Sequence, residues 1–547
     1  MRRIDDIAPS AVLPAQPSET QATLTWWQRA VIYQIAPMSF QDSNGDGRGD
    51  LRGIIDRMDH LEWLGIDAVW LCPIYPSPMR DFGYDISDFT GVDPRFGTLG
   101  DFDELLEALH RRDIRLLLDF VPNHTADDHP WFIESRASRQ SARREWYLWS
   151  DPSPAGGPPN NWLSRFGGSA WEWDEKTGQY YYHAFLKEQP DLNWHNPQVR
   201  RAMADVLRFW LRRGVDGFRV DASAVLAEDT LLRDDPPNPD YDPQTMPPPQ
   251  RLKRIFTDDR PESLRYLEDL RSVVDEFPDR ILAGEVQGKT DRIGQFYGND
   301  SPRLHLPLNF ALLDAPWTAL GLQGEIDAYY NAIPDHAWPD WVMGGHDKRR
   351  IATTKGKAQA RNAAMLALRG TPFFFAGDEI GMEQVPIPPD RIDDAFEKLV
   401  PGYGLNRDPE RVPMRWDADR NGGFTRSEPW LPMGDDIEEK NVARLREDPR
   451  SLLWLYRRLI ALRRNTPALT CGAYCPVRSR NDIFCFKRAL PGQEVLVALN
   501  TMPEPRKLEL SGSAEVLLST GLDRAPQPVS GFLILRPDEG VILQLRD

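Results

Sequence analysis

Residues Val215–Ala222 read VDGFRVDA, and residues Ile281–Val286 read ILAGEV. Both runs are short and mostly apolar, and each carries a carboxylate near its end, Asp221 in the first and Glu285 in the second. A strand that is apolar along nearly its whole length is typical of a parallel sheet covered on both faces. The two runs therefore predict parallel strands with an acidic side chain at each carboxyl end.

Six similar runs complete a regular alternation of strands and helices. Further strands are expected at Ala30–Ala36, Ile66–Ile74, Ile114–Val121, Leu304–Phe310, Trp341–Asp347 and Thr371–Asp378. Amphipathic helices are expected at Leu51–Leu64, Phe102–His110, Val199–Leu211, Ser263–Phe277 and Ala358–Leu368. This alternation predicts an α/β fold, a (β/α)8 TIM barrel. A doubly wound sheet is the alternative, but only a barrel gathers all its charged strand ends on one face.

Long connections divide the chain into further parts. Residues 122–189, rich in Trp, Gly and Pro, predict a small inserted B domain between barrel parts 25–121 and 190–467. The proline-rich loop 222–261 is expected to wall the site. After a helix at Arg450–Arg464, short alternating runs over residues 468–547 predict a C-terminal antiparallel β domain. Residues 1–24 are expected to form a disordered arm.

Composition narrows the possible partners. The 547-residue chain carries 66 Lys and Arg against 83 Asp and Glu, a net charge of −17. Phosphate backbones would be repelled, so we expect no nucleic-acid partner. No apolar run reaches the ~18–20 residues of a membrane span, and the N-terminus lacks the apolar core of a signal peptide. With only four cysteines, the chain is expected in a reducing cytoplasm, as a monomer or homodimer.

The two strand-end carboxylates have different surroundings in the sequence. Arg219 lies two residues before Asp221, so both side chains point to one side of the strand, and the arginine is expected to keep Asp221 ionised by lowering its pKa. Glu285 lies among apolar residues, which predicts a raised pKa and a role as proton donor. Taken singly, each could equally be a structural ion pair or a partnered buried carboxylate.

Other strands deliver polar groups to the same face. Asp85 follows the second strand and His124 the third, and the pair His346–Asp347 ends the seventh. Each alone could be a satisfied hydrogen bond or a turn, but on a barrel all these ends surround one pocket. A retaining glycosidase needs two carboxyls ~5–5.5 Å apart, and neighbouring strands are ~4.8 Å apart. The set therefore predicts glycoside hydrolysis, with Asp221 attacking and Glu285 protonating.

A separate motif, DSNGDGRGD at residues 42–50, has the oxygen ligands of a cation loop. Side-chain oxygens fall at Asp42, Asn44, Asp46 and Asp50, with the Arg48 carbonyl between them. The twelfth position is Gly53 instead of glutamate, so the loop is not an EF-hand. The alternative is an acidic turn that caps the helix beginning at Leu51.

Several of these segments together resemble glycoside hydrolase family 13, the α-amylase superfamily, and specifically its α-glucosidase and oligo-1,6-glucosidase branch. The matching segments, in barrel order, are AVIYQIAPMSFQDSNGDGRGD, FGYDISD, DFVPNHT, GFRVDA, GEV, GGHD, GDEIGM and RDPERVPMRWD. The resemblance extends from Trp26 into the C-terminal domain. It departs from the family at Gly345, where relatives often have Asn, and at Lys348–Arg350.

The resemblance implies roles for individual residues. Asp221 would be the nucleophile, Glu285 the acid/base and Asp347 the transition-state stabiliser. Contacts to the terminal glucose would come from Asp85, His124, Arg219, His346 and Arg411, with Phe166 as an aromatic platform beside the leaving group. The resemblance also implies a structural Ca²⁺ or Mg²⁺ in the loop of Asp42, Asn44, Asp46, Arg48 and Asp50, and no organic cofactor.

These observations predict a retaining, exo-acting α-glucosidase that hydrolyses the terminal α-glucosidic bonds of disaccharides and short oligosaccharides. The alternative is an α-glucosyltransferase or a sugar isomerase that uses the same covalent intermediate. A sugar-binding protein with a lapsed site is disfavoured, because all three carboxylates are present. The residues leave the linkage and the acceptor open.

Overall fold

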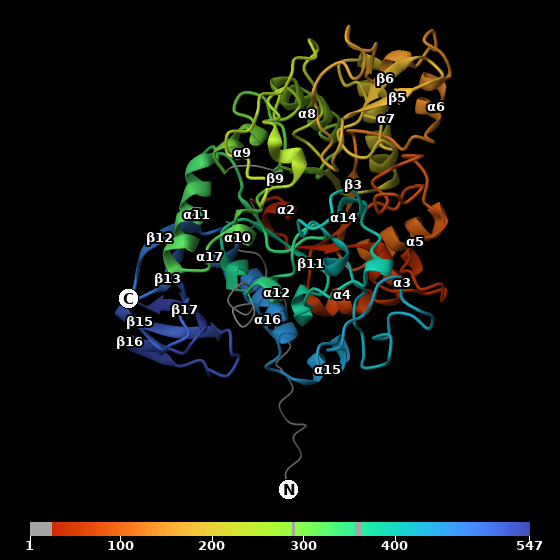
Figure 1. Cartoon of the computed structure of the whole chain (residues 1–547). Coiled ribbons are helices and arrows are strands. Elements are labelled where there is room, and N and C mark those ends of the chain that lie inside the picture. The colour runs from red at the N-terminus through yellow and green to blue at the C-terminus, as the bar shows by residue number, and fades with distance from the viewer. Residues whose placement is uncertain (1–23, 287–289, 356–363, 547) are drawn as a thin grey trace.

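The computed structural model describes residues 24–286, 290–355 and 364–546. Eight parallel strands form its centre, each beside the next in chain order, and the last pairs with the first (Figure 1). The Val342 N–H donates to the Asn309 carbonyl across 3.1 Å and joins the two remaining edges, so the (β/α)8 barrel is confirmed. The strands are β1 (Ile32–Ile35), β2 (Ala68–Leu71), β3 (Arg115–Phe120), β7 (Gly217–Val220), β8 (Ile281–Glu285), β9 (Leu306–Leu308), β10 (Asp340–Val342) and β11 (Thr371–Phe375).

Helices surround the strands, and α7 (Pro197–Arg213) shows how the sequence sets their bounds. The Asn196 side chain accepts the Gln198 N–H, Pro197 occupies the first turn, and Gly214 ends the helix with φ +109°. The other described α-helices are α2 (Trp26–Arg29), α3 (Leu51–Asp56), α4 (Met58–Leu64), α5 (Leu99–His110), α6 (Pro130–Ala137), α8 (Pro261–Val274), α9 (Thr290–Tyr297), α10 (Ala311–Asp314), α11 (Ala319–Ala332), α12 (Ile351–Lys355), α14 (Ala395–Leu399), α15 (Val442–Glu447), α16 (Leu452–Asn465) and α17 (Pro467–Cys471).

Some barrel elements differ from their predicted bounds. β10 ends at Val342 instead of Asp347, because two glycines, Gly344 and Gly345, suit a loop better than a strand. Asp347 therefore lies in the loop after the strand. The helix predicted at Leu51–Leu64 is divided at Arg57 into α3 and α4. The helix predicted at Ala358–Leu368 lies partly outside the described residues, and Ala364–Ala367 form a 3₁₀ turn.

Two smaller sheets complete the architecture. The segment after β3 carries the antiparallel strands β4 (Trp149–Ser150), β6 (Gln179–Tyr182) and β5 (Trp171–Asp174), and it lies beyond the barrel mouth. The C-terminal sheet has the order β12 (Ala473–Arg480), β13 (Ile483–Leu490), β14 (Gln493–Asn500), β17 (Gly540–Arg546), β15 (Arg506–Ser519) and β16 (Pro528–Leu535). The inserted and C-terminal antiparallel sheets agree with the predicted fold class. The N-terminal arm predicted at residues 1–24 falls almost wholly outside the described part of the chain.

The C-terminal sheet corrects two strand predictions. β12 was missed because it has an alternating, half-exposed pattern instead of an apolar run. The apolar runs Lys507–Leu510 and Ala514–Ser519 predict two short strands, where the structure has the single strand β15. The register of β15 on β16 shifts between Glu509 and Ser513, so this polar stretch is a bulge within one strand.

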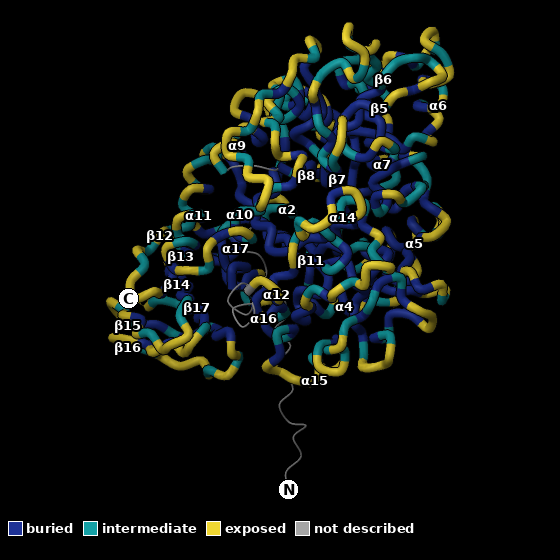
Figure 2. The backbone as a smooth tube through the Cα atoms, in the orientation of Figure 1, coloured by how far each residue is buried: buried dark blue, intermediate teal, exposed yellow. Residues whose placement is uncertain are grey.

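Burial is concentrated at the barrel strands, whose residues are almost all buried (Figure 2). Within the described part of the chain, no helix combines the length and the apolar character needed to cross a bilayer. The four cysteines, Cys72, Cys471, Cys475 and Cys485, form no disulfide.

Candidate active site

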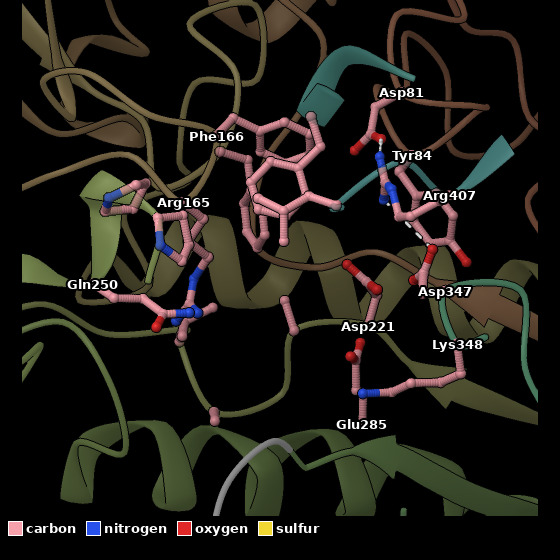
Figure 3. A pocket seen from close by; sticks show the side chains of 18 of the residues that line it. Asp81, Tyr84, Arg165, Phe166, Asp221, Gln250, Glu285, Asp347, Lys348 and Arg407 are labelled. Carbon is pink, nitrogen blue, oxygen red and sulfur yellow. Dashed lines mark hydrogen bonds and ion pairs between the residues drawn. The ribbon is translucent and has the colours of Figure 1, made fainter. Parts of the chain in front are cut away.

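A cavity of about 810 Å³ opens at the carboxyl ends of the barrel strands (Figure 3). Its floor contains Asp221, Glu285 and Asp347. Its walls come from three segments outside the strands: the inserted segment with Arg165 and Phe166, the loop 222–261 with Gln250 and Arg254, and the stretch after β11 with Phe396 and Arg407. The volume is within the range of pockets that hold a small organic ligand.

One arginine holds the two central carboxylates. Arg219 Nη1 lies 2.7 Å from Asp221 Oδ1, and Nη2 lies 2.5 Å from Glu285 Oε2. A third carboxylate, Asp119 on β3, lies 2.8 Å from Nη1, and the guanidinium rests 5.1 Å above the Trp70 ring. Because two nitrogens of one guanidinium bind them, Asp221 and Glu285 are held next to each other at the cavity floor.

The backbone after β7 fixes the position of Asp221. The Asp221 N–H donates to the Phe120 carbonyl at 2.8 Å, and Ala222 turns the chain with a left-handed φ of +49°. The Ser223 hydroxyl then donates to the carbonyl of Glu285, the last residue of β8. A left-handed alanine costs conformational energy and is common at functional sites. The turn ties both carboxylates to one rigid edge.

The pKa of Asp221 is raised, whereas the neighbouring Arg219 was expected to lower it. Burial raises the pKa of Asp221 well above its ordinary value, the charges of Glu285, Asp119 and Asp347 raise it further, and Arg219 opposes them. Arg219 therefore does not by itself keep Asp221 ionised. Asp221 therefore retains its proton to a higher pH than an isolated carboxyl would. A retaining mechanism begins with one such group protonated and the other ionised.

Asp347 has the opposite electrostatics. Burial alone would raise its pKa, but His346, Arg411 and Arg407 hold the pKa of Asp347 well below its ordinary value. Arg411 Nη2 binds Asp347 Oδ1, and Arg407 Nη1 lies 3.4 Å from the same oxygen. Asp347 thus remains a carboxylate at the cavity floor. Arg411 supports Asp347 from behind and does not itself line the cavity.

Two histidines lie at the site in different ways. His124 lines the cavity, and burial lowers its pKa to about 4, so its ring is neutral at neutral pH. His346 is buried behind the wall, stacked on Tyr84 with ring centroids 5.6 Å apart. Its Nε2 lies 2.8 Å from the Tyr84 hydroxyl, and its Nδ1 lies 2.6 Å from Gln34 Nε2. His346 therefore orients Tyr84, which faces the cavity.

Asp85 lies below the cavity wall and does not face the cavity. Its carboxylate is fully buried and accepts hydrogen bonds from the Ser77 hydroxyl and from the N–H groups of Arg80 and Asp81. Burial raises the pKa of Asp85 to about 6, although these hydrogen bonds oppose the rise. Asp85 therefore shapes the loop that presents Asp81.

Asp81 and Arg407 line the catalytic end of the cavity but are not among the site residues expected from the sequence. Both line the cavity, and Arg407 Nη2 lies 2.8 Å from Asp81 Oδ1 (Figure 3). Two left-handed residues, Met79 (φ +62°) and Phe82 (φ +53°), flank Asp81. Asp81 precedes the FGYD motif, and Arg407 opens the RDPERVPMRWD motif, so both residues lay within or beside segments already singled out.

An aromatic group stands opposite the carboxylates. Phe166 lines the cavity, with its ring centroid 4.8 Å from that of Phe396 and 6.2 Å from that of Phe185. The Arg407 guanidinium lies 5.4 Å from the Phe166 ring. This apolar face can receive the less polar side of a sugar ring while Asp81 and Arg407 face its hydroxyls.

The Asp42–Asp50 loop lies outside the cavity and is tied by its own hydrogen bonds. Asp42 accepts three N–H groups of the loop and the Thr425 hydroxyl. Asp50 accepts from Ser43 and from the Gly53 N–H, which caps α3. The donor atoms are all oxygens and suit a hard cation. However, these two carboxylates already use much of their acceptor capacity, and no group of three or more His, Cys, Asp or Glu placed to hold a metal occurs in the described residues.

Known proteins with similar sequences identify the family of this chain. The family model for the α-amylase catalytic domain matches residues 34–472. The chain belongs to the α-amylase family. With this membership and its three gathered carboxylates, the chain is a glycoside hydrolase.

Similar members of the α-amylase family come from several organisms. The chain is 42% identical to a probable α-glucosidase of Rhizobium meliloti, over 89% of this chain and 91% of that protein. It is 38% identical to an oligo-1,6-glucosidase of Parageobacillus thermoglucosidasius, over 87% and 90%. Among solved structures, an α-glucosyl transfer enzyme matches with TM-score 0.90 and 36% identity, over 96% of this chain and all of that one. A trehalulose synthase of Pseudomonas mesoacidophila matches with TM-score 0.86 and 35% identity, over 96% and 100%.

Proposed function

We propose that this chain is a retaining, exo-acting α-glucosidase that hydrolyses terminal α-glucosidic bonds of disaccharides and short oligosaccharides. The observation that carries the proposal is the pair Asp221 and Glu285 on one guanidinium group at the end of two adjacent strands. The names of the relatives support the α-glucosyl specificity. The substrate is a glucoside, in agreement with a pocket lined by aromatic rings and by charged side chains of both signs.

The first step breaks the glycosidic bond. Glu285 gives its proton to the glycosidic oxygen as Asp221 attacks the anomeric carbon, which forms a β-glucosyl ester on Asp221 and releases the leaving group. Arg219 contacts both carboxylates and balances the shift of charge between them. Asp347, Asp81, Arg407 and His124 hold the glucose hydroxyls, and Asp81 takes the contact that the sequence assigned to Asp85.

The second step returns the enzyme to its starting state. Glu285, now ionised, accepts a proton from water as the water oxygen attacks the anomeric carbon and displaces Asp221. Two inversions restore the α configuration. NMR of the products within the first minute tests this proposal: 4-nitrophenyl α-D-glucoside, whose leaving group is not a sugar, should give α-glucose first, which then mutarotates. β-Glucose as the first product would exclude the mechanism.

A second candidate function shares the same ester. The chain is similar to solved structures described as an α-glucosyl transfer enzyme and a trehalulose synthase, so a sugar acceptor could replace water in the second step. Chromatography of products at high maltose and at high sucrose separates the two functions. Predominantly free glucose supports hydrolysis, whereas predominantly new disaccharides or trisaccharides would identify a transferase or isomerase.

We also propose a structural Ca²⁺ or Mg²⁺ in the loop of Asp42, Asn44, Asp46, Arg48 and Asp50. The all-oxygen donor set supports it, with the Arg48 carbonyl as one donor. The ion would stabilise the loop and take no part in the reaction. Chelation with EDTA should therefore lower the melting temperature and leave the initial rate at 25 °C nearly unchanged. An unchanged melting curve, with no metal found by elemental analysis, would reject the site.

The compartment and assembly are further proposals. Four unpaired cysteines suit a reducing compartment such as the cytoplasm. We propose a monomer or a homodimer, which light scattering after size exclusion distinguishes by mass. A larger assembly would contradict the proposal.

A further inference from the structure

The end of the cavity far from the catalytic pair has its own chemistry. Figure 3 shows Arg165 and Gln250 on the side opposite Asp221 and Glu285, with Phe166 between the two ends. Arg254 lines the same cavity and comes from the loop 222–261, as Gln250 does. Because the glucose ring must contact the carboxylates, this far end receives the leaving group.

Within the described structure, Arg254 in this wall has two guanidinium nitrogens without a hydrogen-bond partner. Its Nε and Nη2 atoms are buried and have no hydrogen-bond partner among the described residues. Burial and the neighbouring charge of Arg165 both lower the pKa of Arg254. A buried guanidinium without a partner is unfavourable, so a ligand that supplies acceptors here would be bound strongly.

The nearby carboxylates are already occupied. Asp258 lies 2.7 Å from Arg165 Nη2, which neutralises that arginine. Asp259 binds Arg292, and Asp235 accepts the N–H groups of the backbone at Ile255 and Phe256. Asp258 and Asp235 still favour the charged form of Arg254 from a distance, but no hydrogen bond from Arg254 Nε or Nη2 to either carboxylate occurs among the described residues.

The kind of ligand follows from the donors. A sugar hydroxyl can accept one hydrogen bond from a guanidinium, whereas a carboxylate or phosphate accepts two in parallel and also neutralises the charge. We propose that the outer end of the cavity is a subsite for an anionic leaving group, a carboxylate or a phosphate-type group bound by Arg254. This inference rests on the proposed α-glucosidase function and specifies the substrate class.

The test compares two α-glucosides in two variants. The substrates are 4-carboxyphenyl α-D-glucoside and its uncharged analogue, 4-carbamoylphenyl α-D-glucoside. The enzymes are the wild type, Arg254→Gln and the matched control Lys253→Gln. Lys253 is exposed, does not line the cavity and carries the same charge one residue away. The ratio of kcat/KM for the two substrates, compared between enzymes, cancels their different leaving-group reactivities.

We expect Arg254→Gln to lower the carboxylate-to-carboxamide ratio about tenfold, the effect of a charge-assisted hydrogen bond, and Lys253→Gln to leave it unchanged. A 4-phosphonophenyl glucoside in the same comparison distinguishes the two anions, because the preferred one shows the larger change. Equal ratios in the wild type and Arg254→Gln for both anions would overturn the subsite. Hydrolysis of the carboxamide by the wild type confirms the basic activity independently, and no hydrolysis of any α-glucoside would instead reject the proposed function.

Discussion

At the scale of single residues, the site shifts the pKa values of two neighbouring carboxyl groups in opposite directions. Asp221 is buried among other carboxylates, which raises its pKa, whereas Asp347 faces three cationic or polar partners, which lower its pKa. Arg219 donates hydrogen bonds to both Asp221 and Glu285 and opposes the rise in the pKa of Asp221. Such an arrangement favours catalysis at the expense of stability.

Asp221→Asn should remove activity and stabilise the fold at neutral pH. We expect kcat to fall by a factor on the order of 10⁴ or more, because the attacking oxygen is lost. A carboxyl whose pKa is raised in the folded state costs stability as pH rises above its ordinary pKa, so the variant should melt at a higher temperature than the wild type at pH 7.

The melting difference should shrink as the pH falls toward and below about 4, the ordinary pKa of a carboxyl, because the wild-type carboxyl then becomes protonated in the unfolded state as well. Thermal melts of both proteins from pH 4 to pH 8 measure it. A variant that is less stable at pH 7 would show that Asp221 is instead stabilised by its pairing with Arg219.

Asp81 and Asp85 should respond differently to the same change. Asp81→Asn should lower kcat/KM by about 100-fold with little change in melting temperature, because its carboxylate faces the cavity and Arg407. Asp85→Asn should mainly lower the melting temperature, because an amide nitrogen replaces one of the two oxygens that accept three buried hydrogen bonds. The opposite pattern would return the substrate contact to Asp85.

At the scale of elements, the loop after β10 places Asp347. Arg350 anchors it from behind: its Nη1 lies 2.7 Å from the Ala376 carbonyl and 3.1 Å from Asp378 Oδ1, and its Nε lies 3.0 Å from the Glu410 carbonyl. The loop is thus tied to the end of β11 and to the segment that carries Arg411. Of the charged residues that follow Asp347, Arg350 is structural, whereas Lys348 and Arg349 line the cavity.

Gly345→Asn should stabilise this loop. A Cβ at Gly345 would lie 3.7 Å from Gln34 Oε1, a buried acceptor with no hydrogen-bond partner in the described structure. The amide of an asparagine can donate a hydrogen bond to this oxygen, and replacing glycine also restricts the unfolded chain. Together these effects should raise the free energy of unfolding by about 1 kcal/mol. Thermal melts should show a higher melting temperature for Gly345→Asn. Gly345→Ala should show a smaller increase, because alanine restricts the unfolded chain but cannot donate the hydrogen bond. Equal effects of both variants would mean that no hydrogen bond forms.

The sequence predicted the features that depend on residues close together in the chain. Long apolar runs such as that at β3 identified the barrel strands, and carboxylates at their ends identified Asp221 and Glu285. The sequence pattern does not tell which of Asp81 and Asp85 faces the cavity. The fold of the loop between β2 and α5 decides this, because it buries Asp85 and turns Asp81 toward the cavity. The pKa of Asp221 likewise depends on carboxylates from β3, β8 and the Asp347 loop, which only the barrel brings together.

At the scale of the whole molecule, the walls determine which substrates can enter. The inserted segment, the loop 222–261 and the stretch after β11 surround the strand ends on several sides. These walls form a pocket around the terminal sugar instead of an open groove along a polymer. The proline-rich wall that carries Pro247, Pro249 and Gln250 is stiff and shapes the side for the leaving group.

Activity should therefore fall with the length of the substrate. We expect kcat/KM per chain end to be at least about tenfold lower for soluble starch than for maltose, since only the chain end fits the pocket. Reducing-sugar assays across maltose, maltotriose, maltoheptaose and starch measure the trend. A rise with length, with internal cleavage products, would indicate an open groove and an endo-acting enzyme.

The central claim is that Asp221 carries the glucosyl group while Glu285 moves the proton. The most direct measurement is mass spectrometry of peptides after reaction with 5-fluoro-α-D-glucosyl fluoride, whose ester is hydrolysed slowly enough to be trapped. The predicted result is a fluoroglucosyl group on the peptide that contains Asp221, absent from Asp221→Asn. A fluoroglucosyl group on Glu285, or inactivation without any ester, would contradict the mechanism.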